Sequence, residues 1–294
     1  MNSASDIAIQ RITGNIGAVI GGVDLRTQLP GDIVGKLRQA ILDHGVIFFR
    51  SQDVTLDQFW AFMENFGLPM KEESSGTDHD RPEDVQTGDL SYTRHATATW
   101  HADTTSLAKP PIATALRAVE VPPFGGDTCW SSVTAAWEGL SEPLRRMLDG
   151  LTAVHSVIST YERMGQYRPG FEANYGSRHA IEQVHPVVLT HPETGRKALY
   201  VSETFTTRIV ELDKRESDAV LSALFRHIER PEYTMRWKWT VNDMAFWDNR
   251  STQHYAVPDY QTTRRMQRIV LAGARPGQPS SLTSRTKSLA ENAA

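Results

Sequence analysis

Cysteine is nearly absent from this chain, and its scarcity limits the compartments in which the protein is expected to work. The 294 residues include one cysteine, Cys129, so no disulfide can form within the chain. A chain without disulfides is typical of a reducing compartment, which favours the cytoplasm. Cys129 lies in a segment that we predict to be a strand, and we interpret it as a buried, unreactive thiol rather than a nucleophile.

Long apolar runs and a basic leader segment are also missing. No stretch of eighteen apolar residues occurs, so we expect no membrane span. Residues 1–6 contain neither the positive charge nor the apolar core of a secretion signal. These two absences favour a cytoplasmic protein that does not bind to a membrane.

Charge of one sign is not in excess either. The chain has 31 Lys and Arg residues against 35 Asp and Glu residues, which gives a formal net charge of −4. This balance gives no reason to expect nucleic acid or an anionic membrane as a partner. Hydrophobic residues make up 39% of the chain and charged residues 22%, as is typical of a soluble globular protein with a proper core.

A dinucleotide-binding loop is not evident, although glycine is frequent near the start of the chain. Gly14, Gly17, Gly21 and Gly22 do not follow G-x-G-x-x-G spacing, and no strand-to-helix unit surrounds them. We interpret this segment as short strands joined by flexible turns.

Short helices and strands are predicted along most of the chain. Apolar residues recur at helical spacing over residues 32–44, and Gly45 and a buried strand at 46–49 follow. A capping box, in which a helix-opening side chain and the residue three positions later satisfy each other's backbone amides, is predicted twice. The two pairs are Thr55 with Gln58 and Asp213 with Glu216.

The strand pattern favours a jelly roll over a parallel α/β sheet. Strands are predicted at residues 113–121, 127–132 and 235–239, and a hairpin over 187–201. Many short strands with helices outside them are typical of one jelly-roll core. We therefore predict a mainly β fold with flanking helices (α+β), as a single domain over residues 1–276.

Two polar segments and the end of the chain depart from this pattern. Residues 70–98 and 160–182 are predicted insertions that contain few apolar anchors. The first ends just before His101 and Asp103, two candidate metal ligands, so it is either a lid over their site or a mobile surface loop. Residues 277–294 are rich in Ser, Gly, Pro and charge, and we expect a disordered tail.

A His-x-Asp pair, His101 and Asp103, is the strongest indication of chemistry, together with the distant His254. Residues i and i+2 of a strand share a face, so we predict that both donors of the pair point at one ion from a strand. Two imidazoles and one carboxylate form the facial triad of non-haem Fe(II) oxygenases. By itself the pair is weak, since chance alone gives about one such tripeptide in a chain of this length. The alternative is a capping Asp beside a half-buried His.

Motifs elsewhere in the chain make the metal interpretation specific. In chain order they are Trp100-His101-x-Asp103, Gly125-Gly126-Asp127-Thr128, Trp247-Asp248-Asn249-Arg250, His254 and Arg264-x-x-x-Arg268. With these motifs the chain resembles the taurine / 2,4-dichlorophenoxyacetate dioxygenase family, which depends on Fe(II) and 2-oxoglutarate. They follow the family's order at nearly its spacings and run through most of the chain.

The resemblance implies both the fold and the reaction. It implies a double-stranded β-helix (a jelly-roll, cupin-like core) with His101, Asp103 and His254 as catalytic iron ligands at one mouth of the barrel. Fe(II), 2-oxoglutarate and O2 are the implied cofactor and cosubstrates. The expected reaction oxidises, and most simply hydroxylates, a C–H bond of a small to medium organic substrate, with release of succinate and CO2.

The far carboxylate of 2-oxoglutarate needs a fixed cation, and three arginines near the end of the chain compete for this role. Strand alternation places Arg264 and Arg268 on one face and Arg265 on the other. Only Arg264 and Arg268 keep the family's spacing, so Arg264 is our choice over Arg265 for 2-oxoglutarate. The resemblance also implies that the Thr128 hydroxyl assists in holding this carboxylate. Without the resemblance, Thr128 is simply a residue suited to strands.

The resemblance assigns Arg268 to the substrate, because its counterpart in several relatives binds an anionic group. The substrate is therefore expected to be acidic, although a surface salt bridge is the ordinary fate of an arginine. Thr97 stands where taurine-specific relatives have an amide side chain, which argues against taurine itself. Thr97 and Tyr92 are candidates to line a different, larger pocket. An intact Asp103 also argues against a halogenase, in which a small residue occupies this position.

Two other functions remain open on sequence grounds. The barrel could serve as a metal- and 2-oxoglutarate-binding sensor without redox chemistry. A zinc hydrolase has suitable ligands, but a general base at defined spacing, as in H-E-x-x-H, is absent. The remaining histidines lack partners at ligand spacing and are interpreted as structural or solvated. A homo-oligomer, a dimer or a tetramer, is the default expectation for the assembly.

Overall fold

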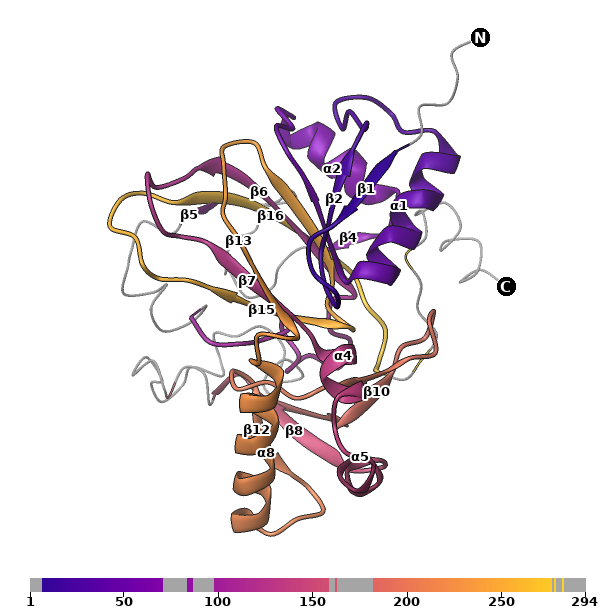
Figure 1. Cartoon of the computed structure of the whole chain (residues 1–294), viewed down its shortest axis with the longest axis vertical. Helices are drawn as coiled ribbons and strands as arrows, with labels where there is room; N and C mark the ends of the chain where they lie inside the picture. Colours follow the sequence, from indigo (N-terminus) through magenta and orange to yellow (C-terminus); the bar gives the residue numbers. More distant parts are fainter. Residues whose placement is uncertain are drawn as a thin grey trace.

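The computed structural model describes residues 7–70, 84–86, 98–158, 162, 182–276, 278 and 282. Its helices are short and lie outside the sheets (Figure 1). They are α1 (Gly31–His44), α2 (Leu56–Glu64), α4 (Val133–Glu138), α5 (Glu142–Leu148) and α8 (Lys214–Ile228). Within the described part of the chain, no helix has both the length and the apolar character that crossing a bilayer requires.

The main sheet has eight strands in the order β1-β2-β3-β14-β6-β16-β4, and β5 also pairs with β16. Its first four strands in chain order are β1 (Ala8–Arg11), β2 (Ala18–Gly21), β3 (Val46–Phe49) and β4 (Pro69–Met70). The others are β5 (Asp84–Gln86), β6 (Ala113–Glu120), β14 (Met244–Asp248) and β16 (Arg265–Leu271). Strands far apart in sequence are thus neighbours in one layer.

A second sheet of three strands, in the order β13-β7-β15, forms the opposite layer of a jelly-roll core. Its strands are β13 (Thr234–Trp237), β7 (Thr128–Ser132) and β15 (Thr252–Ala256). Large aromatic side chains fill the space between the layers. Trp130 of β7 packs edge-on against Phe48 of β3 and against Trp247 of β14. The mainly β jelly-roll fold with flanking helices is therefore confirmed.

Burial on both faces explains why β3 is wholly apolar. Phe48 faces the interior between the sheets, whereas Ile47 and Phe49 face the cluster that α1 and α2 cover. All four residues of β3 are buried. A strand that is covered on both sides needs apolar residues at consecutive positions, so the alternation of a half-exposed strand is lost.

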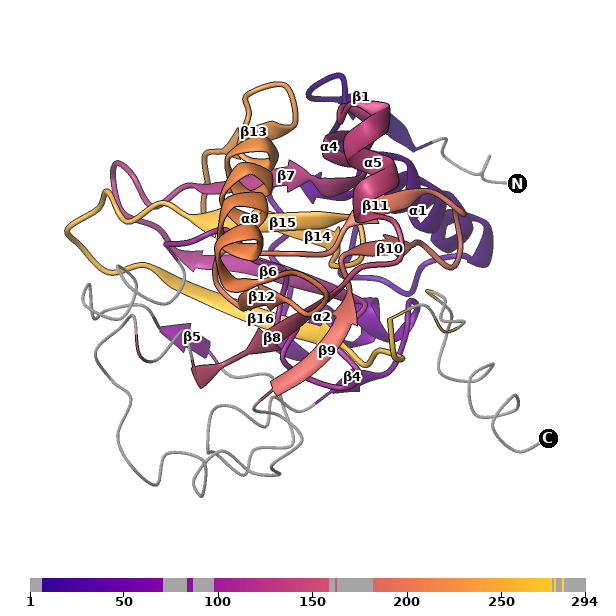
Figure 2. The ribbon, with the colours of Figure 1, turned by 90° about the horizontal axis from the view of Figure 1, so that it is seen from below.

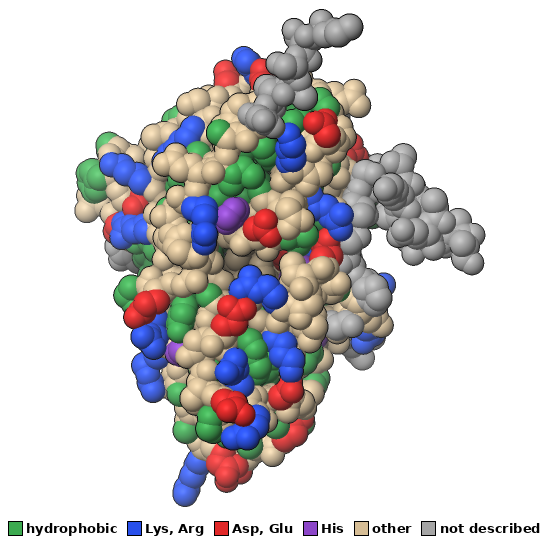
Figure 3. All heavy atoms as spheres, turned by 45° about the vertical axis from the view of Figure 1, so that its right-hand side comes forward, with side chains coloured by type: hydrophobic (Ala, Val, Ile, Leu, Met, Phe, Trp, Pro, Cys, Tyr) green, Lys and Arg blue, Asp and Glu red, His purple; other side chains and the backbone are tan. Residues whose placement is uncertain are grey.

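The remaining strands form a smaller lobe beside the jelly roll, in which α8 and α4 cover short sheets (Figure 2). One sheet has the order β12-β8-β9, and the other pairs β10 with β11. These strands are β8 (Thr152–Ser156), β9 (Glu182–Pro186), β10 (Val188–Thr190), β11 (Lys197–Leu199) and β12 (Thr206–Ile209). Charged side chains of both signs are interspersed over the face drawn in Figure 3.

Local sequence signals placed several elements correctly. Both capping boxes are present, at Thr55 with Gln58 and at Asp213 with Glu216. The predicted hairpin is the antiparallel pair of β10 and β11. Gly45 ends α1 with a positive φ of 73°, a conformation that glycine adopts without strain.

The two predicted insertions, 70–98 and 160–182, lie mostly outside the described residues, so their role as lids stays a prediction. In the predicted tail, the structure describes Gln278 and Leu282. Leu282 is 1% exposed within the core cluster of the main sheet, and its backbone N–H donates to Glu193 Oε1 at 3.1 Å. Position 282 is therefore anchored to the domain.

Candidate metal centre

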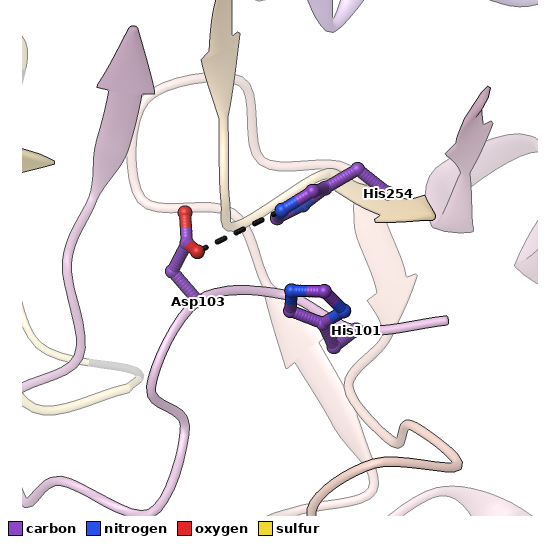
Figure 4. A group of neighbouring side chains, drawn as sticks. All are labelled: His101, Asp103 and His254. Carbon is purple, nitrogen blue, oxygen red and sulfur yellow. Dashed lines mark ion pairs between the residues drawn. The ribbon is translucent and has the colours of Figure 1, made fainter. Parts of the chain in front are cut away.

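Three side chains from two distant segments lie close together: His101, Asp103 and His254 (Figure 4). One donor atom of each lies within 4.8 Å of the donor atoms of the other two. The residues are 7%, 3% and 7% exposed. No other group of three His, Cys, Asp or Glu residues in the described part of the chain could hold a metal ion in this way.

A single β-bridge brings the two histidines together. His101 N donates to His254 O at 3.1 Å, and His254 N donates to His101 O at 2.8 Å. Residues that exchange both hydrogen bonds lie directly opposite each other with their side chains on the same side. His254 is held in turn by β15, which pairs with β7 so that His254 lies opposite Trp130.

The prediction that His101 and Asp103 share one face of a strand is wrong. His101 forms only the isolated bridge, and Asp103 lies in the turn that follows. The next residue, Thr104, has a positive φ of 46°, which turns the chain sharply after Asp103. The carboxylate therefore reaches the histidines through a turn rather than through strand alternation.

Two buried histidines of the smaller lobe hold this turn. His155 Nδ1 lies 2.9 Å from Thr105 Oγ1, and His185 Nε2 lies 3.0 Å from Leu107 O. Burial lowers the pKa of His155 to about 3, so this side chain is neutral at neutral pH. His155 and His185 are structural, as the sequence interpretation held, but they lie immediately beside the candidate ligands.

The protonation state of His101 follows from its hydrogen bond. His101 Nδ1 lies 2.7 Å from the backbone carbonyl oxygen of Thr99. A carbonyl only accepts, so Nδ1 carries the hydrogen and Nε2 keeps a lone pair. Burial lowers the pKa of His101, which favours this neutral form. A carbonyl that fixes the ring of a ligating histidine is typical of metal sites.

His254 has a different environment. Its Nε2 lies 3.7 Å from Asp103 Oδ1, while its Nδ1 is buried without a hydrogen-bond partner. Its ring packs against Trp247, with the ring centroids 4.8 Å apart. Burial is the main cause that lowers the pKa of His254 to about 3, and the neighbouring His101 imidazole adds to it. The imidazole is thus neutral at physiological pH and offers a lone pair.

The two oxygens of Asp103 have different partners. Oδ1 lies on the side of His254 and is 3.4 Å from Arg268 NH1. Oδ2 accepts a hydrogen bond of 2.6 Å from Thr114 Oγ1. Burial by itself would raise the pKa of Asp103, but the neighbouring His254, Arg268 and His101 side chains and the Thr114 hydrogen bond lower it to about 2. The carboxylate is therefore ionised.

A second group of polar side chains lies around Thr128, where β7 begins. Arg264 is 5% exposed, and it donates from Nε to Gly126 O at 2.9 Å and from NH2 to Thr128 Oγ1 at 3.2 Å. Trp239 Nε1 also donates to Thr128 Oγ1, at 3.0 Å. Because both lone pairs of this hydroxyl accept, its hydrogen is left to donate to an incoming acceptor.

The turn before Thr128 explains the paired glycines of its motif. Gly125 and Gly126 have φ values of 71° and 70°, which side chains with a Cβ rarely adopt. A Cβ on Gly125 would collide with Asp259 O, and one on Gly126 would lie 3.2 Å from Arg264 Cδ. The two glycines therefore let the turn approach the loop that leads to Arg264.

The three competing arginines have separate surroundings. The Arg265 side chain is 37% exposed and lies 4.0 Å from Glu120, away from Thr128. The Arg268 side chain is 25% exposed and reaches Asp103. Arg264 is the one that contacts Thr128. Thr97 and Tyr92, the predicted pocket residues, lie outside the described residues.

Asn249 has a role that the sequence did not indicate. Asp and Asn side chains commonly fix a turn through hydrogen bonds to the backbone two residues on, which is the ordinary role for Asp248 and Asn249 after β14. Asp248 does so, since its Oδ1 accepts from Arg250 N at 2.8 Å. The Asn249 amide instead reaches Trp247, Asp103 and Thr114. No sequence signal links Asn249 with Thr114, because they are 135 residues apart.

The donor set fits a divalent iron ion. Two neutral imidazoles and one ionised carboxylate lie within reach of a single ion, and three protein donors leave half of an octahedral coordination sphere open. Arg264 and Thr128 place a guanidinium beside a hydroxyl, and both groups can donate hydrogen bonds to a carboxylate. The arrangement is suited to an iron centre that also binds a dicarboxylic cosubstrate.

Comparison with known proteins agrees with this chemistry. The family model "Taurine catabolism dioxygenase TauD, TfdA family" matches residues 8–270. An alkylsulfatase of Acinetobacter baylyi is 36% identical, over 92% of this chain and 87% of the relative. An alpha-ketoglutarate-dependent sulfate ester dioxygenase of Pseudomonas putida is also 36% identical, over 93% of this chain and 92% of the relative.

Two solved structures share the whole fold. The crystal structure of a taurine dioxygenase from Burkholderia xenovorans has a TM-score of 0.78 at 36% identity and covers 92% of each chain. The structure of AAD-2 with Mn(II) and N-oxalylglycine has a TM-score of 0.80 at 27% identity, over 93% of this chain and 100% of the other. The chain belongs to the TauD/TfdA family and is a non-haem iron dioxygenase that depends on 2-oxoglutarate.

Proposed function

We propose that His101, Asp103 and His254 hold the Fe(II) of this dioxygenase, and that its substrate is an anionic organic molecule. The observation that carries the metal assignment is the convergence of the three buried donors within 4.8 Å of one another. When bound, iron and 2-oxoglutarate activate O2, so that a substrate C–H bond is oxidised with release of succinate and CO2.

Arg264 and Thr128 hold the far carboxylate of 2-oxoglutarate in this proposal. A guanidinium meets a carboxylate with two parallel hydrogen bonds, and such charge-assisted bonds are strong inside a protein. Burial lowers the pKa of Arg264, yet an arginine remains protonated at neutral pH. The buried cation therefore gains from a bound anion, and the Thr128 hydroxyl supplies a further donor.

Arg268 binds the anionic group of the substrate. Its NH1 lies 3.4 Å from Asp103 Oδ1, so an anion on this guanidinium is held beside the metal ligands. Sulfate esters are the first class to test, because two relatives at 36% identity are named for them. Hydroxylation of the carbon that bears the sulfate group gives an unstable adduct, which separates into an aldehyde and sulfate. Thr97 and Tyr92 remain predicted pocket residues.

The test has an anaerobic and an aerobic stage. Addition of Fe(II) and 2-oxoglutarate without oxygen is expected to give a visible metal-to-ligand charge-transfer band. After oxygen is admitted, succinate release is measured with a panel of alkyl sulfates, sulfonates and phenoxy carboxylates. We expect faster release with a sulfate ester than with its uncharged alcohol.

Controls separate the parts of this proposal. His254→Ala is expected to lose the charge-transfer band, whereas Arg268→Ala should keep the band and lose the acceleration by the anionic substrate. A band without succinate for any acid would contradict the proposed substrate class and favour a binding module. The cytoplasmic location and a dimeric or tetrameric assembly stay predictions, and light scattering tests the assembly.

A further inference from the structure

A chain of buried hydrogen bonds leads from Trp247 in β14 to the carboxylate of Asp103. It consists of Trp247 Nε1 to Asn249 Oδ1 at 2.9 Å, Asn249 Nδ2 to Thr114 Oγ1 at 2.9 Å, and Thr114 Oγ1 to Asp103 Oδ2 at 2.6 Å. Trp247, Thr114 and Asn249 are at most 3% exposed. These contacts join three separate segments of the chain beside the candidate metal centre.

The direction of each hydrogen bond in this chain is determined. An indole N–H and a backbone N–H can only donate, and Asn249 Oδ1 faces Trp247 Nε1 and, at 3.4 Å, the backbone N–H of Asp103. The orientation of the Asn249 amide is therefore fixed, and its Nδ2 must donate to Thr114 Oγ1. The single hydroxyl hydrogen of Thr114 is then left for Asp103 Oδ2.

The fold explains why Thr114 points at this site. Thr114 of β6 lies directly opposite Trp247 of β14 in the antiparallel register, so the two side chains share a face. Trp247 belongs to the core between the two sheets, whereas Ala113 and Ala115 on either side of Thr114 face the cluster under α1 and α2. Thr114 thus presents a hydroxyl to the interior between the two sheets.

We propose that Thr114 and Asn249 are positioning residues, which restrict Asp103 to a single metal-facing oxygen. The Thr114 hydroxyl occupies Oδ2, and Oδ1 alone is turned toward His254. A carboxylate that used both oxygens would take an additional coordination position. If only one carboxylate oxygen of Asp103 binds the metal, three coordination positions remain for 2-oxoglutarate and O2. This inference rests on the proposed assignment of the metal to His101, Asp103 and His254.

Thr114→Val, which removes the hydroxyl at nearly constant volume, tests the inference in the full-length protein. Co(II) is the probe, because it binds nitrogen and oxygen ligands and its visible absorption reports the coordination number. Mutation of a residue that orients a metal ligand typically costs about 10- to 100-fold in metal affinity. We expect a loss of this size for Thr114→Val together with a changed Co(II) spectrum, and recovery of both in Thr114→Ser.

Thr206→Val is the matched control. Thr206 is 7% exposed, and its Oγ1 accepts from Ser202 N at 2.9 Å in the smaller lobe, so this variant also loses one buried hydroxyl hydrogen bond. It is expected to bind Co(II) with unchanged affinity and spectrum. A second variant, Asn249→Ala, keeps Thr114 but removes the amide that orients its hydroxyl, and should lose affinity several-fold. If Thr114→Val does not fold, the Co(II) affinity of Asn249→Ala tests the positioning role by itself.

The possible outcomes are distinct. Wild-type affinity and spectrum in Thr114→Val would overturn the inference, as would a Thr114→Ser variant that is as impaired as Thr114→Val. An equal loss of Co(II) affinity in Thr206→Val would show that the effect is general destabilisation, and this result would also overturn the inference. If the wild-type protein itself bound no Co(II), the proposed metal site would fail, which differs from failure of the positioning role alone.

Discussion

Arg264 and Arg265 are adjacent residues with opposite surroundings. Arg264 is buried against Gly126 and Thr128, whereas Arg265 is partly exposed beside Glu120. The pairing of β16 with β6 is irregular between Arg265 and Met266, but the register skips a residue on β6, at position 119. Alternation along β16 is therefore preserved, so Met266 and Arg268 share a face. Arg264 lies just before β16, and its side chain contacts Thr128 of the other sheet.

This difference predicts unequal effects on cosubstrate binding. Arg264→Ala removes a charge-assisted contact of about 1.5–3 kcal/mol, so we expect the Kd of 2-oxoglutarate to rise by about 10- to 100-fold. Arg265→Ala should change it by less than about 2-fold, since an exposed charge pair contributes little. The measurement is an anaerobic titration of the charge-transfer band. The reverse order of the two variants would show that the strand-alternation argument is wrong.

At the scale of elements, the turn between β14 and β15 is held by a buried ionic network. Arg250 donates to Asp248 Oδ2 at 2.6 Å and to Glu193 Oε1 at 2.8 Å, and His191 Nε2 lies 3.1 Å from Asp248 Oδ2. Asp248 is 0% exposed and Arg250 is 6% exposed. The Arg250 guanidinium keeps the pKa of Asp248 below its usual value despite the opposing effect of burial. This turn leads directly to His254.

Arg250→Ala is therefore predicted to destabilise the fold strongly. Removal of one partner leaves Asp248 and Glu193 buried with less compensation, and such a change typically costs about 3–5 kcal/mol of unfolding free energy. Arg196→Ala is the matched control, because the Arg196 and Glu138 side chains are 46% and 51% exposed and should contribute less than about 1 kcal/mol. Urea denaturation measures both, and equal losses would refute the role of the network.

At the scale of the whole molecule, buried imidazoles make stability depend on pH. Burial lowers the pKa of His101, His155, His185 and His254. His155, for example, has a pKa of about 3 in the folded protein against 6.5 for an unperturbed histidine. Between these two values the unfolded chain binds more protons than the folded one, so the free energy of unfolding falls as the pH falls.

The metal-free protein should therefore lose stability as the pH is lowered from 7 to 5. One such group contributes at most about 1.4 kcal/mol per pH unit in this window. His155→Asn, which keeps an amide near the position of Nδ1, is expected to reduce the slope of unfolding free energy against pH. Urea denaturation with a chelator present, at several pH values, gives this slope. An unchanged slope in His155→Asn would contradict the contribution of this residue.

Several helices and strands follow from local sequence patterns, which act between residues close together in the chain. The capping boxes at Thr55 and Asp213 depend on side chains within one turn of their own helix, so they are readable from sequence. The turn that carries Asp103 is not local in this sense. It depends on contacts with His155 and His185, which belong to the smaller lobe. The prediction of a strand at Asp103 was wrong for this reason.

The sequence by itself determined which donors are available: two histidines, one carboxylate, and an arginine pair at a spacing that places both on one face. The tertiary structure alone decided how they act. Asn249 lies 146 residues from Asp103 and 135 from Thr114, yet it links both. Hydrogen-bond direction, burial and the pKa of a carboxylate arise from such remote contacts, and no local pattern encodes them.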